Sequence, residues 1–355
     1  MKPGLWLLWL AVAVLPDRME AAPLKRQPLG LEFTYRGYYD NNLLRYSPRD
    51  RGRYFDRAET HASAIRSLDD WRSDFKLTAS YADQYLNNRK TSLQGTFNFA
   101  QHASNPVKNF GWMSFTARQE LSEGIDAAVN YFYEPRYYIR DYNDRQTGEF
   151  HKSEFALNQW TGRLYFHPSK AAEFVGHYRR KDYFYSEFFT EYDGGSNEFG
   201  LSAVGRIEGW RAELGWDYSV FTNTGFSSLD RRPPQDNLND DEGGQSDYEE
   251  DAFSLSLQRR MKIAGRRARA EIALSFARRY WTTGLTPEED PAHSGRLDRI
   301  RTIEASQSFA LDKRNELQVG FDYGARKSSG NDPLPAELKT YYRWGGWVEW
   351  ACTLR

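Results

Sequence analysis

Cysteine is almost absent from this sequence of 355 residues, which contains only Cys352. A single cysteine excludes an internal disulfide and a cluster of thiolate ligands around a metal. An excess of one charge is also missing, because 48 Lys and Arg residues balance 49 Asp and Glu residues, and no nucleic-acid partner is predicted. The signatures G-x-S-x-G, H-E-x-x-H and the glycine-rich phosphate loop do not occur, so no catalytic residue, metal site or cofactor is predicted.

Long apolar runs are missing as well. The apolar run Leu5–Leu15 is shorter than the roughly 20 residues that a membrane-spanning helix needs. It follows a basic start and precedes the small residues Ala21-Ala22, which is the pattern of a secretory signal peptide. We predict a cleaved signal peptide over residues 1–22, with Ala11–Ala13 as a rival cleavage site, and a single domain over residues 23–355.

Aliphatic residues are scarce and the mean hydropathy is -0.80, whereas 16% of the residues are aromatic. A soluble protein of this length normally buries an aliphatic core. The segment Trp71–Tyr81 has a different pattern, in which most odd positions are apolar and the even positions include Arg72, Asp74 and Lys76. This period of two indicates a β-strand with one apolar face and one charged face.

Runs with this alternation repeat along the chain, and we count fourteen of them. They lie near residues 30–39, 70–82, 89–100, 110–120, 125–139, 150–166, 171–186, 196–208, 210–221, 250–263, 267–281, 298–311, 314–327 and 337–352. Long connections such as 40–69 and 222–249 alternate with short ones such as 208–209. The apolar positions change parity between Leu157 and Trp160, which predicts a β-bulge near Asn158.

An even number of alternating strands with connections of two lengths predicts an all-β fold. The specific prediction is a transmembrane antiparallel up-and-down β-barrel of about fourteen strands whose apolar face contacts lipid. A soluble β-sandwich with the charged face outside is the alternative. It is less favoured because so many strands leave sheet edges to protect, and because Tyr and Trp gather near strand ends, as at 183–189 and 341–350.

The alternating runs, the two classes of connection and the aromatic-rich last run resemble the bacterial outer-membrane β-barrel proteins of porin-like build. The resemblance implies the outer membrane of a Gram-negative bacterium, contact with its lipid and lipopolysaccharide, and insertion by the barrel-assembly machinery. Such barrels commonly end on an aromatic residue, whereas this chain ends in VEWACTLR, with Trp350 five residues before the end.

If the apolar face contacts lipid, the polar positions face the interior. The residues predicted to line a pore are Arg72, Asp74, Lys76, Glu173, His177, Arg179, Glu213, Asp217, Arg269 and Glu271. Both signs occur in similar number, so weak ion selectivity is expected. Alternatively, these charges pair across neighbouring strands and plug the interior. About eight strands leave an interior filled by side chains and about sixteen leave a channel, so fourteen favours a channel.

Two connections and one histidine need separate interpretation. We interpret the basic, aromatic connection 40–69 as a solvated surface loop, with an inward constriction or contact with lipopolysaccharide as alternatives. Segment 236–251 carries eight acidic residues, but its glycines do not fit an EF-hand, so a flexible acidic loop is favoured over a calcium site. His177 falls on an inward face, and Glu173, about 13 Å away along the strand, is too distant to orient it.

Passive diffusion of small hydrophilic solutes through a charged, near-neutral lumen is the function that this pattern favours. The alternatives are the barrel of a polysaccharide export or envelope-anchoring system and a structural barrel with a plugged lumen. A hydrolase is less favoured, because it needs a histidine close to a carboxylate or to a serine nucleophile at the rim or on the outer wall.

Overall fold

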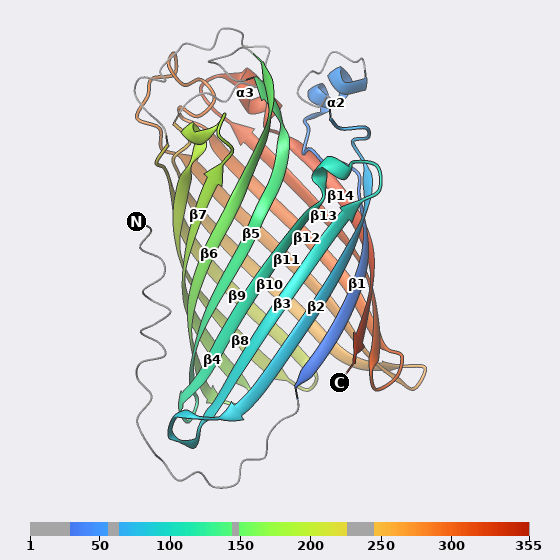
Figure 1. The fold of residues 1–355 in the computed structure, drawn as a ribbon. Helices are drawn as coiled ribbons and strands as arrows, with labels where there is room; N and C mark the ends of the chain where they lie inside the picture. Colours follow the sequence, from blue (N-terminus) through green and yellow to red (C-terminus); the bar gives the residue numbers. More distant parts are fainter. Residues whose placement is uncertain (1–28, 56–63, 144–148, 226–244, 355) are drawn as a thin grey trace.

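The structure, a computed structural model, describes residues 29–55, 64–143, 149–225 and 245–354 (Figure 1). The predicted signal peptide and residues 236–244 of the acidic segment lie outside the described residues. Strands account for most of the described chain. No helix in these ranges is long and apolar enough to cross a membrane.

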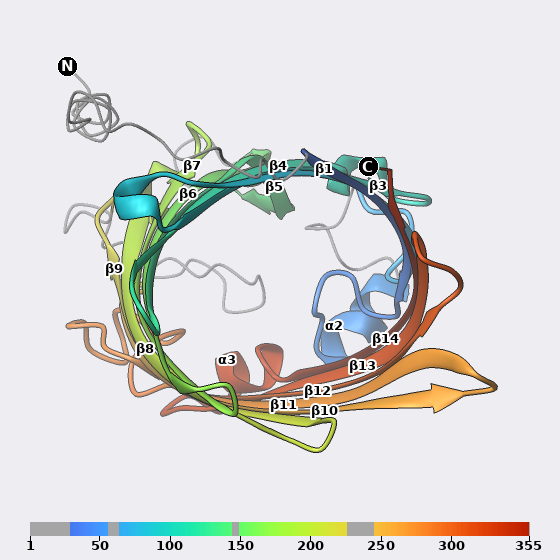
Figure 2. The same ribbon diagram turned by 90° about the horizontal axis from the view of Figure 1, so that it is seen from below.

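The backbone forms one closed barrel of fourteen antiparallel strands. Consecutive strands pair with each other, and β1 closes the barrel against β14, as the view in Figure 2 shows. The strands are β1 (Gly30–Asp40), β2 (Asp70–Gln84), β3 (Lys90–His102), β4 (Phe110–Ser122), β5 (Ile125–Asn143), β6 (Phe150–Ser169), β7 (Ala172–Tyr185), β8 (Gly194–Ile207), β9 (Trp210–Asn223), β10 (Tyr248–Ile263), β11 (Arg266–Trp281), β12 (Leu297–Ala310), β13 (Asn315–Ser329) and β14 (Tyr341–Thr353). The predicted fold class and strand count are confirmed, and the sandwich alternative is wrong because a single closed sheet contains all these strands.

Short turns join the strands at one end of the barrel and longer connections join them at the other, as predicted (Figure 1). In two of the short turns both central residues have positive φ, namely Glu208 and Gly209 (46° and 85°) and Ala264 and Gly265 (49° and 77°). Two consecutive positive φ angles make a type I′ turn, whose twist matches that of the strands it joins. These turns therefore fix the register of the hairpins β8–β9 and β10–β11.

The outer wall of the barrel is apolar. One row across four strands consists of Leu255, Leu274, Ile303 and Tyr323, each directly opposite the next. Leu274 and Ile303 are 41% and 46% exposed. A monomeric soluble protein rarely exposes so continuous an apolar face, whereas lipid is a suitable solvent for it. The architecture is therefore that of a membrane barrel, as the resemblance implied.

The predicted β-bulge near Asn158 is wrong. Strand β6 pairs with β7 without a shift from Phe155 to Phe166, and the irregularities lie in β5, between Glu134 and Tyr137 and between Tyr138 and Arg140. The apolar residues change parity because Phe155 faces the interior, where its ring contacts other aromatic rings, whereas the later apolar residues of β6 face outward.

The first long connection packs at the mouth of the barrel. A small core joins this connection to β5 and consists of Leu44, Tyr46, Ile65, Leu68 and Tyr138. Its helix α2 (Pro48–Phe55) carries Arg49, whose Nη1 lies 3.9 Å from Oε2 of Glu337 in α3 (Pro333–Leu338). Figure 2 shows both helices inside the outline of the barrel. The prediction that connection 40–69 is a solvated surface loop is therefore wrong for its described residues. They pack at the mouth of the barrel and narrow it (Figure 2).

Candidate functional site: the charged inner wall

The structure places all ten predicted pore-lining residues on the inner wall. On β2, Arg72, Asp74 and Lys76 alternate with the lipid-facing residues Phe75 and Leu77. The same alternation orients the others, because residues separated by an even number share one face of a strand. The alternation that places apolar residues on the outer wall therefore places polar residues on the inner wall.

The three residues of β2 line a cavity of about 200 Å³ against the inner wall. Nη2 of Arg72 donates to Oδ2 of Asp74 over 2.9 Å. Lys76 has neither an ion pair nor a hydrogen bond to any other residue in the described part of the chain. Its ammonium group is therefore available to the interior of the barrel.

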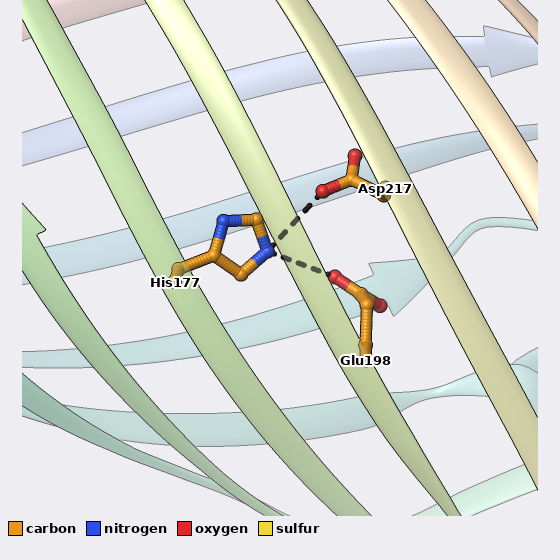
Figure 3. Close-up of side chains that lie close together, drawn as sticks. All are labelled: His177, Glu198 and Asp217. Atoms are coloured by element: carbon orange, nitrogen blue, oxygen red, sulfur yellow. Dashed lines mark hydrogen bonds and ion pairs between the residues drawn. The ribbon is translucent and has the colours of Figure 1, made fainter.

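Strands β7, β8 and β9 contribute an ion-pair network centred on Glu198 (Figure 3). Nε2 of His177 lies 3.2 Å from Oε1 of Glu198 and 3.2 Å from Oδ1 of Asp217. Oε1 of Glu198 also accepts from Nη1 of Arg179 over 2.6 Å, and Oε2 accepts from Nζ of Lys181 over 3.3 Å. Glu198 on β8 thus joins three cationic or protonatable groups on β7. Spacing within one strand does not predict this role, because the partners lie on the neighbouring strand.

Gly200 makes the long contact from β7 to β9 possible. It lies opposite both His177 and Asp217, and a Cβ at this position would overlap Cε1 of the histidine and Oδ1 of the aspartate. Because position 200 of β8 has no side chain, the ring of His177 can reach across this strand to the carboxylate of Asp217.

Gly200→Ala is expected to break the contact between His177 and Asp217 at a modest cost, about 1 kcal/mol of unfolding free energy, because the displaced groups are flexible side-chain ends. The measurement is a double-mutant cycle of His177→Gln and Asp217→Asn, in the wild-type and Gly200→Ala backgrounds. We expect a coupling energy between the two sites in the wild type and none with alanine at 200. Equal coupling in both backgrounds would contradict the geometry.

The same three ligand-type residues, His177, Glu198 and Asp217, offer atoms within 4.8 Å of one another. This grouping would suit a divalent cation if the carboxylates were free. Both oxygens of Glu198 are already bonded to Arg179 and Lys181, which would repel a second cation. We therefore interpret the group as a salt-bridge network. In the described chain no hydroxyl or thiol hydrogen bonds to the ring of His177, so no nucleophile accompanies it.

The remaining predicted residues also have polar partners. Glu173 pairs with Arg206 at 3.0 Å and lies 3.4 Å from His167, so it does not orient His177. Glu213 pairs with Arg211 at 2.6 Å.

Arg269 and Glu271 complete the set. Arg269 pairs with Glu316 at 3.3 Å. Glu271 accepts hydrogen bonds from Ser256 and Gln258, each over 3.1 Å. Every partner of the predicted residues lies on the same strand, an adjacent strand or the next but one. The ion pairs consequently follow the wall and do not bridge the lumen.

Sequence reasoning missed an arc of aromatic rings on the inner wall near the loop end. The inner aromatic arc consists of Phe110, Tyr137, Phe155, Tyr183, Phe221, Tyr248 and Trp281. Successive ring centroids lie 5.1 to 6.0 Å apart. The guanidinium of Arg279 lies 4.0 Å from the ring centre of Tyr248.

Some aromatic residues near the strand ends therefore face outward, and others face the interior. In the segment 183–189, one of the aromatic strand ends noted in the sequence, Phe184 is 52% exposed outward, whereas Tyr183 contacts inward rings. The signal was present in the parity, because Tyr183 is an even number of residues from the inward-facing His177.

Comparison with known proteins finds only distant structural likenesses. No protein-family model and no curated protein matches the chain. Among solved structures, the outer membrane channel DcaP of Acinetobacter baumannii is 10% identical, with a TM-score of 0.48 over 91% of this chain and 96% of that one. A bacterial polysaccharide outer membrane secretin is 7% identical, with a TM-score of 0.47 over 92% and 98%. OmpT of Vibrio cholerae is 8% identical, with a TM-score of 0.45 over 94% and 100%. Likenesses this distant carry no argument about this chain.

Proposed function

We propose that this protein is an outer-membrane channel through which small hydrophilic solutes diffuse passively. The observation that carries the proposal is the arrangement of the inner wall, where the ion pairs of the predicted residues run along the wall of a closed fourteen-stranded barrel and none of them crosses the interior. Because both signs of charge occur and mostly neutralise each other, the lumen discriminates weakly between cations and anions.

The proposed location rests on the same architecture. A closed barrel satisfies every backbone hydrogen bond without water, and an apolar outer wall requires a lipid solvent. Antiparallel single-chain barrels with short turns at one end and long loops at the other are typical of the outer membrane of Gram-negative bacteria. A cleaved signal peptide over residues 1–22 and insertion by the barrel-assembly machinery belong to the same proposal.

A conduit for polysaccharide is the second candidate, and the inner aromatic arc favours it, because sugar rings pack well on aromatic faces. The helices α2 and α3 count against it. Both project into the outline of the mouth and are linked by the pair of Arg49 and Glu337, whereas an exported polymer needs an unobstructed exit (Figure 2).

Single-channel conductance in a planar bilayer tests the proposed function. The refolded protein is expected to give stable open steps with weak ion preference. Asp40 and Asp70 lie directly opposite each other, so residues 41–69 can be replaced by a two-residue turn without changing the β1–β2 register. This variant is expected to conduct more, because it lacks the packed loop at the mouth.

The outcomes separate the alternatives. A protein that is silent in both forms, with unchanged strand content by circular dichroism, contradicts the channel and favours a plugged structural barrel. Conductance only after loop replacement contradicts free diffusion and favours a gated or export conduit.

A further inference from the structure

The outer wall carries a row of like charges near the loop end. Arg278 on β11 lies directly opposite Arg299 on β12, which lies directly opposite Lys327 on β13. Arg301 lies two residues along β12 from Arg299, opposite Phe276. We call these four cations, which share the face of the lipid-facing residues, the outer basic row.

This row has no counter-charge among the residues that the structure describes. No carboxylate in the described ranges lies within ion-pairing distance of the four cations. The nearest acidic residue by register is Asp251, opposite Arg278, and it accepts a hydrogen bond from Nε1 of Trp216 over 3.3 Å. Like charges directly opposite on neighbouring strands destabilise a sheet, so the row costs stability in isolation.

Another outward-facing arginine on the same wall avoids this loss of stability, because the barrel supplies its counter-charge. Arg180 on β7 also faces outward, and its Nη2 lies 2.6 Å from Oδ1 of Asp182. Its Nη1 also donates to Oδ1 of Asn197 over 3.3 Å. The outward charge of Arg180 is therefore neutralised within the barrel wall, whereas no described residue neutralises the charges of the outer basic row.

The row lies where the apolar band ends. Along β11, Ile272, Leu274 and Phe276 face outward before Arg278. The guanidinium groups of Arg278 and Arg301 lie 5.6 and 5.9 Å from the ring centre of Phe276, so one lipid-facing ring supports two of the cations. The exposed Tyr280 lies just beyond them, which is typical of the level of lipid headgroups.

We propose that the outer basic row binds the phosphate groups of an anionic glycolipid in the leaflet on the loop side. The inference rests on the proposed membrane location, not on channel activity. Arginine presents a planar fork that matches phosphate oxygens. The three charges in register extend over two interstrand spacings, about 10 Å, which suits a glycolipid with two phosphates better than a single phosphate.

The test measures binding by the intact protein in detergent, with diphosphorylated lipid A as the probe and its dephosphorylated form as the comparison. Thermal unfolding is followed as each lipid is titrated. Lipid A is expected to raise the unfolding temperature of the wild type, and the dephosphorylated form is not. Arg299→Gln, at the centre of the row, is expected to bind lipid A about tenfold more weakly. Without lipid, this variant is expected to be at least as stable as the wild type, because it relieves repulsion.

The matched control is Arg259→Gln, an exposed outward arginine on β10 at the turn end, 4.9 Å from the ring of Trp210. It is expected to leave lipid A binding unchanged. The proposal is overturned if both variants lose equal affinity, if Arg299→Gln loses none, or if the dephosphorylated lipid stabilises equally. Inorganic pyrophosphate is titrated separately, and a stabilisation by pyrophosphate equal to that by lipid A overturns a lipid-headgroup site in favour of a soluble phosphate. None of these results depends on whether the barrel conducts.

Discussion

Replacing Asp298 with alanine is expected to lower the free energy of unfolding by about 3–5 kcal/mol. Asp298 lies near the loop end of β12, and its side chain is fully buried. Its carboxylate lies 3.3 Å from Nε of Arg296 and 3.0 Å from Nη2 of Arg326. Removing it takes the charge of this carboxylate away from the buried guanidinium of Arg296 and the partly buried one of Arg326.

Burial and the neighbouring charges of Arg296 also favour keeping this carboxylate. Burial, followed by the nearby Arg326, lowers the pKa of Arg296 to about 9, whereas Asp298 acts in the opposite direction. Asp298 also accepts hydrogen bonds from Nε1 of Trp281 over 2.9 Å and from Oγ of Ser328 over 2.6 Å. Asp298→Asn removes the charge but retains an acceptor for one of these bonds, so its cost is expected to lie between the wild type and alanine.

Denaturant unfolding in detergent, followed by tryptophan fluorescence, measures these differences. Glu213→Ala is the matched control, because Glu213 is also an inner-wall carboxylate paired with an arginine, but about a third of its side chain is exposed. Its loss is expected to cost less than about 1 kcal/mol. If Asp298→Ala and Glu213→Ala lowered the free energy of unfolding equally, burial of the Asp298 network would not be the reason for its contribution to stability.

The strands and their faces were predictable because the lipid solvent imposes a strict alternation. Apolar residues at every second position identified each of the fourteen strands, with boundary errors of a few residues. The two largest errors were at the end of the fifth run, expected at residue 139 where β5 ends at Asn143, and at the start of the last run, expected at residue 337 where the helix Pro333–Leu338 lies and β14 begins at Tyr341. Short polar or mixed segments next to loops carry too little alternation to locate a boundary.

The partners on the inner wall were not predictable, because they depend on register between strands. His177 looked isolated along its own strand, yet β8 and β9 bring Glu198 and Asp217 to it, the second only because position 200 is glycine. The prediction of a β-bulge near Asn158 is wrong for a related reason. An apolar residue in a membrane barrel was assigned to lipid, but an aromatic arc on the inner wall supplies a second apolar environment.

Replacing Leu274 with arginine is expected to lower the free energy of unfolding by about 2–4 kcal/mol in lipid vesicles. Leu274 lies in the middle of the outer apolar row, between Leu255 on β10 and Ile303 on β12. A guanidinium at this position loses water without gaining a partner, because both neighbours are aliphatic. Phe75→Arg, between the rings of Tyr35 and Phe99 on the opposite part of the wall, is expected to behave in the same way.

Lys76→Ala is the matched control, because Lys76 is one residue from Phe75 but faces the interior and has no ion pair or hydrogen bond in the described chain. Its cost is expected to stay within about 0.5 kcal/mol. Reversible denaturation in vesicles measures all three variants, and repeating it in bilayers of decreasing thickness adds a test of depth. The cost of Leu274→Arg is expected to fall as the bilayer becomes thinner, since the arginine then reaches the interface, whereas the cost of Lys76→Ala stays constant. Equal costs for the two classes of substitution would mean that the assigned outer and inner faces are wrong, and with them both the channel and the outer basic row.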